Sequence, residues 1–235
     1  MLLRSGLSAA AAAACYLSAR DAPRMSFTCD ASAAPGACVG DVALFSTGSA
    51  LVETTYTYSS DMNGETMRMD TDCSCWANYV LTSYYPAAFA LVTNDTTVQP
   101  SVPRAKQYYE FLAAQPAGGA PWANVADIRT VKHGDVLAYE LPSGSTDTGH
   151  VMFAIDDGVN PITTPYSGRS DAIWVYVADA STVIHKQDTR CPSCKFKTGL
   201  GRGYMAFQFN SSGVASQFQF CKSAPTPPAR PPTRP

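Results

Sequence analysis

The sequence predicts an α+β fold in which one helix comes before an antiparallel sheet of about five strands. Two observations carry this prediction. A capping residue at position 72 opens a run with an apolar period of about 3.6 residues, and runs with apolar residues at every second position recur after residue 135. A helix followed by a series of strands, without regular alternation of the two, is typical of an α+β domain.

The predicted helix begins at Cys73 and ends before Pro86. Asp72, or Thr71 before it, is a favoured N-cap residue, and a proline ends a helix at the residue before it. One face of this helix would carry Cys73, Trp76, Ala77, Val80, Leu81 and Tyr84. We therefore expect Cys73 to face the sheet and Cys75 to point away from it.

The expected strands of the sheet are residues 135–140, 150–155, 172–178, 204–209 and 217–220. Asp179 would stand at the end of the third strand. A second, short helix is expected at residues 105–114, after a long connection. The glycine-rich segment 199–203 precedes a strand and does not open a helix, so it predicts a tight turn or a close backbone approach instead of a phosphate site.

The chain of 235 residues is expected to hold one main domain at residues 63–221. Residues 25–62 would form an N-terminal extension with two short strands, 39–45 and 51–58. The proline-rich residues 222–235 would form a disordered tail.

Residues 1–24 are expected to be a targeting segment. Arg4 precedes an alanine-dominated run, 6–19, that is too short to span a membrane comfortably, and no acidic residue occurs before Asp21. A cleaved secretory signal is the preferred interpretation, which would place the protein outside the cell or in the cell envelope. Membrane attachment through a lipid on Cys15 and an organellar transit peptide are the alternatives.

The formal net charge of −2 provides no basic field for nucleic acid, so nucleic-acid binding is not expected. No P-loop, GxGxxG or HExxH motif occurs, no cofactor is expected, and no oligomeric state is predicted. Eight cysteines in an exported chain predict disulfides. A zinc site built from Cys29, Cys38, Cys191 and Cys194 is the alternative, although a zinc ribbon normally has two closely spaced pairs.

Cys73 is the candidate nucleophile. A thiol in the first turn of a helix lies at the positive end of the helix dipole, which favours its thiolate form. A thiolate nucleophile needs a base that takes and returns the proton, and that base needs an orienting acceptor. His150 is the candidate base, and Asp179 is suited to accept from its Nδ1–H. Taken singly, a disulfide-bonded cysteine, a structural histidine and a solvated carboxylate are the alternatives.

Four short motifs occur in a fixed order: Asp-Cys-Ser-Cys at 72–75, Gly-Asp-Val-Leu at 134–137, Gly-His-Val at 149–151 and Asp-Ala-Ser at 179–181. In this order they resemble the NlpC-like family of papain-fold cell-wall cysteine peptidases and, more loosely, the related CHAP amidases. The resemblance covers about residues 65–182.

The resemblance implies a papain-like fold with the nucleophile helix packed on the sheet. It also implies catalytic roles for Cys73 as nucleophile, His150 as general base and Asp179 as orienting residue. The implied reaction is hydrolysis of an amide bond, in a peptidoglycan stem peptide or another peptide, through an acyl-enzyme.

The chain departs from the family pattern in four ways. Cys75 replaces the usual glycine, and the third residue is often a histidine in the family instead of Asp179. The gaps between the three site residues exceed the family's compact layout. The tyrosine that family members often carry upstream of the nucleophile has two candidates, Tyr56 and Tyr58.

Two more residues are candidates for substrate binding. His185 could take the place of Asp179, and Arg190 could hold a substrate carboxylate in a bidentate pair. The alternative is a solvated loop with a surface pair between Asp188 and Arg190. His133 is expected to be structural.

Two other classes of function compete with a cysteine hydrolase. A thiol-redox or metal-binding protein is suggested by the closely spaced pairs Cys73/Cys75 and Cys191/Cys194. A non-catalytic cell-wall-binding module on the same scaffold is the other.

Overall fold

The computed structural model describes residues 23–29, 35–94, 102–142, 145, 147–191 and 193–220. Most of the expected targeting segment, Cys15 and the expected tail 222–235 lie outside these residues. Among the described residues, no helix has the length and apolar character needed to cross a membrane.

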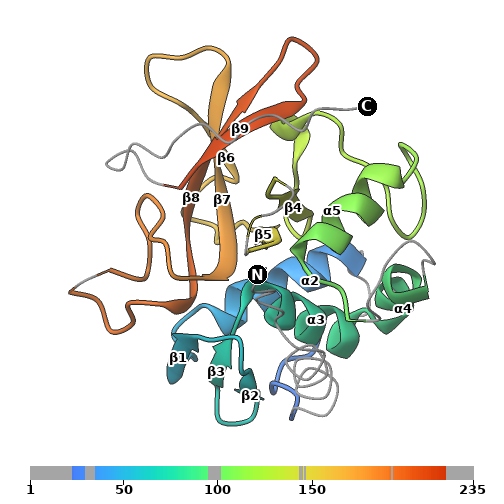
Figure 1. Ribbon diagram of the computed structural model, residues 1–235. Helices are drawn as coiled ribbons and strands as arrows, with labels where there is room; N and C mark the ends of the chain where they lie inside the picture. Colours follow the sequence, from blue (N-terminus) through green and yellow to red (C-terminus); the bar gives the residue numbers. More distant parts are fainter. Residues whose placement is uncertain are drawn as a thin grey trace, which may run out of the picture.

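The described chain has an α+β fold with four α-helices and two sheets (Figure 1). The helices are α2 (Pro35–Ser46), α3 (Cys73–Tyr84), α4 (Pro86–Asn94) and α5 (Ala105–Ala114), with a 3₁₀ turn at Ile128–Thr130. The strands are β1 (Glu53–Tyr56), β2 (Asp61–Asn63), β3 (Arg68–Thr71), β4 (Val136–Glu140), β5 (Gly149–Ala154), β6 (Thr163–Pro165), β7 (Ala172–Ser181), β8 (Gly199–Phe209) and β9 (Ala215–Gln219).

The main sheet has the order β4-β5-β7-β8-β9 with every neighbouring pair antiparallel, and β6 adds to β7 beside this path. The expectation of an antiparallel sheet of about five strands after the first predicted helix is confirmed. A small second sheet, β1-β3-β2, lies next to the start of α3 (Figure 1). The helices gather near β4 and β5, where α3 packs on β5 and α5 on β4.

Alternate residues of β5 belong to two hydrophobic cores. Val151 and Phe153 lie in the core that contains α2 and α3, while Met152 and Ala154 lie in a smaller core on the other side. The period-two pattern of this strand therefore reflects burial on both faces. Trp76 of α3 meets Phe153 edge to face, with ring centroids 5.2 Å apart, and this contact fixes the helix against the strand.

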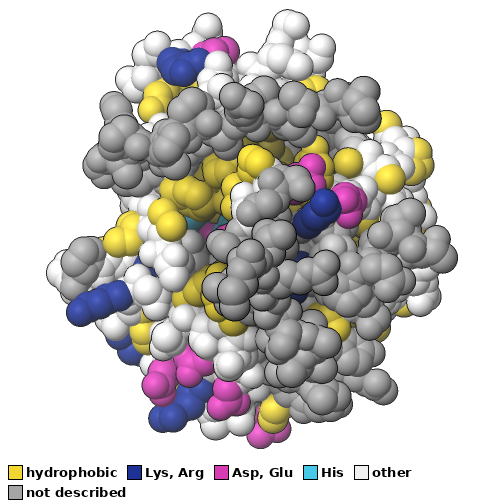
Figure 2. All heavy atoms as spheres, in the orientation of Figure 1, with side chains coloured by type: hydrophobic (Ala, Val, Ile, Leu, Met, Phe, Trp, Pro, Cys, Tyr) yellow, Lys and Arg dark blue, Asp and Glu magenta, His cyan; other side chains and the backbone are white. Residues whose placement is uncertain are grey.

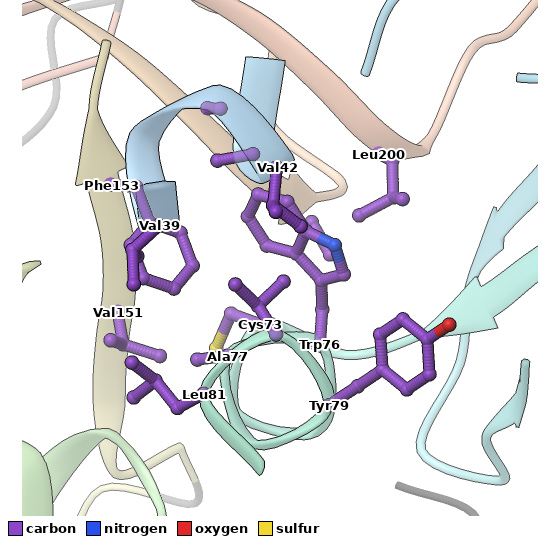
Figure 3. Packing of buried hydrophobic residues seen from close by; sticks show 14 of the residues in the cluster. Val39, Val42, Cys73, Trp76, Ala77, Tyr79, Leu81, Val151, Phe153 and Leu200 are labelled. Carbon is purple, nitrogen blue, oxygen red and sulfur yellow. The ribbon is translucent and has the colours of Figure 1, made fainter. Parts of the chain in front are cut away.

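Helix α3 is capped as expected. Asp72 has an extended backbone and accepts a 2.8 Å hydrogen bond from the backbone N–H of Cys75. The expectation of one buried face was too simple, because ten of its twelve residues are buried. Figure 3 shows Cys73, Ala77 and Leu81 toward the side of Val151, while Tyr79 points elsewhere. The Tyr79 hydroxyl donates to the Pro23 carbonyl at 2.8 Å, so the N-terminal segment covers that other side.

Three expectations about local structure were wrong. Residues 39–45 form part of α2 and not a strand, because a short, mostly apolar run does not distinguish the two. Part of the expected long connection is α4, which begins at Pro86, where proline suits a first helical turn. Asp179 lies inside β7 instead of at its end, because β7 pairs with β8 as far as Ser181.

The glycine-rich segment 199–203 belongs to β8 and does make the expected close approach. A Cβ on Gly201 would come within 2.4 Å of the Arg190 side chain, and a Cβ on Gly203 within 2.8 Å of the His185 Cβ. These two glycines therefore let the segment that carries His185 and Arg190 lie directly on the strand.

Candidate active site

Cys73 is the first residue of α3 and is 5% exposed. It is the free cysteine of the described residues. Cys75, two positions along the same helix, is disulfide-bonded. The two cysteines of the Cys-Ser-Cys motif therefore differ in chemistry, and of these two only Cys73 has a free thiol that could act as a nucleophile.

His150 lies beside Cys73, near the start of an inner strand of the main sheet on which α3 packs. It is the second residue of β5 and pairs with Tyr139 across the β4–β5 ladder. Its Nε2 donates a 2.6 Å hydrogen bond to Asp179 Oδ2, and its side chain is also hydrogen-bonded to the Cys73 thiol. Because Nε2 serves Asp179, the ring nitrogen left for the thiol is Nδ1. The expected use of Nδ1 for Asp179 was therefore wrong, and the imidazole is oriented the other way round.

The surroundings of His150 favour its charged form. Burial alone lowers its pKa, but the charge of Cys73 and the hydrogen bonds with Asp179 and Cys73 outweigh burial and raise the pKa to about 10. At neutral pH His150 is therefore an imidazolium, and it lies beside the Cys73 sulfur. A cationic imidazole next to a cysteine is a setting that supports nucleophilic catalysis.

Asp179 is completely buried and receives donors from three residues. Its Oδ2 accepts from His150 at 2.6 Å and from His185 Nε2 at 2.9 Å, while its Oδ1 accepts from Arg190 Nη2 at 2.7 Å. Burial by itself would raise the pKa of this carboxyl, but the charges of Arg190 and His185 and the histidine hydrogen bonds hold it well below the usual range. The carboxylate is thus ionised and fixed in place.

Arg190 supports Asp179 and does not reach the solvent. The side chain is 1% exposed, with Nε and Nη2 on Asp188 and Nη1 on the carbonyl oxygen of Gly199 at 2.7 Å. Its donors are already occupied, so the suggested grip on a substrate carboxylate is not compatible with this arrangement. The expected pair with Asp188 exists, but it is buried instead of solvated.

His185 stands next to Asp179 instead of replacing it. Its side chain has no exposed surface, and its ring stacks on Phe220 with centroids 5.5 Å apart. Its Nδ1 has no hydrogen-bond partner within the described part of the chain. The structure therefore brings Cys73, His150 and Asp179 together and places His185 behind them, away from a substrate.

A cavity of about 340 Å³ opens on the exposed side of His150. Its lining residues are Tyr56, Tyr139, Leu141, Pro142, Asp147, Gly149, His150, Ser181, Thr182, Val183, Phe218 and Phe220. Figure 2 shows hydrophobic side chains gathered around a small visible patch of histidine on this face. The volume lies in the range of small-ligand pockets.

Tyrosines surround the thiol. The pKa values of Tyr56, Tyr108 and Tyr139 are all raised, first by burial and then by the charge of Cys73, which indicates that all three lie near its sulfur. Of the two upstream candidates, Tyr56 lines the cavity, whereas Tyr58 is 45% exposed and does not.

Sequence reasoning missed the far wall of the cavity. Phe218 and Phe220 come from β9 and the residue after it, and Asp147 comes from the polar loop before β5. The Asp147 position could have been suspected, because a loop that ends at the candidate base must pass close to the site. The β9 residues gave no such signal, since their alternation indicates only a strand.

The other described cysteines form the disulfides Cys29–Cys38 and Cys191–Cys194. These four residues are the ones considered for zinc, and paired sulfurs are not thiolate ligands. The two disulfides are compatible with a secreted protein.

Comparisons of this chain with protein-family models, with curated proteins and with solved structures found no match.

Proposed function

We propose that this protein is a cysteine hydrolase of amide bonds, with Cys73 as nucleophile, His150 as acid and base, and Asp179 as the residue that orients His150. The observation that carries the proposal is the buried chain from the free Cys73 thiol through His150 to Asp179, with a 2.6 Å hydrogen bond between the last two. The papain-like arrangement and the NlpC-like resemblance are part of the same proposal.

The first half of the reaction forms an acyl-enzyme. The Cys73 thiolate attacks the carbonyl carbon of the amide, and the C=O π electrons move onto the oxygen. When this oxyanion collapses, the C–N bond breaks and the leaving amine takes the proton from His150 Nδ1. A thioester on Cys73, a free amine and a neutral imidazole remain.

The second half returns the enzyme to its starting form. The neutral His150 takes a proton from water through Nδ1, and the resulting hydroxide attacks the thioester. The C–S bond breaks, the acid leaves, and the thiolate and imidazolium are restored. Asp179 stays ionised throughout, because Arg190 and His185 hold its charge.

The start of α3 provides a donor for the oxyanion. The carboxylate of Asp72 accepts from the backbone N–H groups of Ser74 and Cys75, which satisfies two of the first-turn donors. The N–H of Cys73 is then the first-turn group closest to the reacting carbon, and we assign it to the oxyanion.

Peptidoglycan stem peptides are the first substrate to test, in keeping with a secreted or envelope location. We expect wild-type protein to release amines from peptidoglycan fragments or from a peptide amide, and Cys73→Ala to lose this activity by at least about a thousandfold. Ser83→Ala, on the same helix and 9% exposed, is the matched control and should keep wild-type activity. Equal activity in wild type and Cys73→Ala would disprove the proposal, and wall binding that survives without hydrolysis in either would favour the non-catalytic module.

A thiol-redox function is the second candidate, since the Cys191–Cys194 disulfide spans a CxxC motif and Cys191 is partly exposed. Insulin reduction assayed with Cys191→Ser and with Cys73→Ser separates the two. Loss of reductase activity only in Cys191→Ser, with no amide hydrolysis in wild type, would select the redox function.

A further inference from the structure

The cavity beside His150 has a pronounced chemical bias. Four aromatic rings line it, from Tyr56, Tyr139, Phe218 and Phe220. Tyr139 and Phe218 stack with centroids 3.9 Å apart, so this wall is a rigid apolar surface. A volume of about 340 Å³ accommodates one large side chain together with part of its backbone.

The charged residues of the described cavity lining include an acidic side chain but no lysine or arginine. Apart from His150, the charged residue is Asp147, which is exposed, and none of the described lining residues is a lysine or an arginine. The negative charge of Asp147 contributes to the raised pKa of Tyr56, in β1, and to that of Tyr139, in β4. Its field therefore extends over the cavity instead of being confined to the loop.

The buried arginine that pairs with Asp179 cannot compensate for this bias. Arg190 is 1% exposed and is bound to Asp179 and Asp188, so its charge is neutralised and out of reach of a ligand. The cation of the described lining is His150, and its ring is already hydrogen-bonded to Asp179 and Cys73, so a carboxylate that enters the cavity would lose hydration without gaining an unengaged cationic partner there. A cation would keep an ionic partner in Asp147.

We propose that this cavity selects substrates that carry a large apolar or aromatic side chain beside the scissile amide and a cationic group within reach of Asp147, and that it disfavours anionic ones. The inference rests on the proposed function only in taking Cys73 as the reactive group. It narrows the substrate class to neutral or cationic peptide segments.

Alkylation of Cys73 tests this selectivity without requiring hydrolysis. Three chloroacetyl-phenylalanine probes of similar size serve: the 2-aminoethylamide is cationic, the N-ethylamide is neutral and the glycine conjugate is anionic. In each case the sulfur–carbon bond forms and chloride leaves. Second-order rates of Cys73 modification are measured by mass spectrometry at low salt and again at high salt.

We expect the cationic probe to react about five to ten times faster than the anionic probe at low salt, and the ratio to shrink at high salt. Asp147→Asn, which keeps the acceptor for the Gly149 N–H, should bring the ratio below about two. Glu65→Gln removes one negative charge at an exposed turn away from the cavity and should leave the ratio unchanged. Equal rates in wild type, a faster anionic probe, no modification of Cys73 by any probe, or an unchanged ratio in Asp147→Asn would overturn the proposal.

The apolar requirement has its own control. Val183 lines the cavity and is 44% exposed, whereas Val159 is 85% exposed and does not line it. We expect Val183→Ser to reduce the preference for a phenylalanine probe over an alanine probe about twofold to threefold, and Val159→Ser to leave it unchanged. Equal effects of the two variants would contradict an apolar subsite. Charge selectivity without amide hydrolysis would retain this inference and reject the proposed function, while hydrolysis without selectivity would do the reverse.

Discussion

Two Asp-x-Arg turns in this protein have similar local hydrogen bonds but differ in how deeply the arginine is buried. In one, Asp127 Oδ1 accepts from the backbone N–H of Arg129 at 2.9 Å and from its Nε at 2.8 Å. In the other, Asp188 Oδ1 accepts from the backbone N–H of Arg190 at 2.7 Å and from its Nε at 2.9 Å. The arginine side chain is 47% exposed in the first turn and 1% exposed in the second.

The difference lies in what each turn packs against. Arg129 lies over the Phe209 ring at the surface, where water solvates both charges. Arg190 lies on β8 at Gly201, and its Nη2 donates to the Asp179 carboxylate at 2.7 Å. A local ion pair is therefore a minor surface feature in one place and the support of a candidate active site in the other. The following predictions test this contrast, beginning with the largest expected effect.

Asp179→Asn should have the largest effect on activity. The amide can still accept from one donor, but it leaves the imidazolium of His150 without a counter-ion, so we expect kcat to fall about a thousandfold or more. Asp127→Asn, the matched change in the exposed turn, should leave kcat unchanged. Steady-state kinetics on the same peptide amide provide the measurement, and a loss below tenfold in Asp179→Asn would remove its orienting role.

Arg190→Met should have the largest effect on stability. It leaves Asp179 and Asp188 buried without their cation, and we expect unfolding free energy to fall by about 3–5 kcal/mol. Arg129→Met should leave the denaturation midpoint unchanged, because water solvates Asp127 when its partner is removed. Urea denaturation of both variants provides the midpoints for this comparison. Equal midpoints would show that burial does not make the two turns differ in their contribution to stability.

His185→Gln should have an intermediate effect. It removes one of the three donors to Asp179, and a hydrogen bond to a charged group contributes about 1.5–3 kcal/mol. We expect the free energy of unfolding to fall by about 1.5 kcal/mol, the lower end of this range, and kcat to fall by less than tenfold. A kcat loss as large as that of Asp179→Asn would instead make His185 the orienting residue.

The pH dependence should show the smallest and most specific change. Because the pKa of His150 is raised to about 10, its imidazolium persists through neutral pH, and kcat/KM should fall only as pH rises toward 10. The Asp179 carboxylate contributes to that raised pKa. In Asp179→Asn, the loss of residual activity with rising pH should therefore begin at a lower pH than in wild type. Asp127→Asn should retain the wild-type profile, and an unshifted limb in Asp179→Asn would show that the carboxylate does not act on His150.

Several elements could be predicted because their signals are local. The Asp72 cap and the stop at Pro86 bound α3, and residues 105–114 form α5 at the predicted positions. The alternating runs of the C-terminal half became β4, β5, β7, β8 and β9. Helix α2 was missed, because its run packs against α3 and carries Asp41 as its one charged residue, which is too little to reveal a helical period.

The sequence by itself determined where Cys73 stands on its helix, that His150 lies near the start of a strand, and that the strands form an antiparallel sheet, since caps and periodicity act over a few residues. The tertiary structure decided which of the two Asp-x-Arg turns binds the Asp179 carboxylate and which ring nitrogen of His150 donates to that carboxylate. It also decided that Phe218 and Asp147 line the same cavity. These relations join residues from different strands and loops, and their energies depend on burial, which no local pattern of residues specifies.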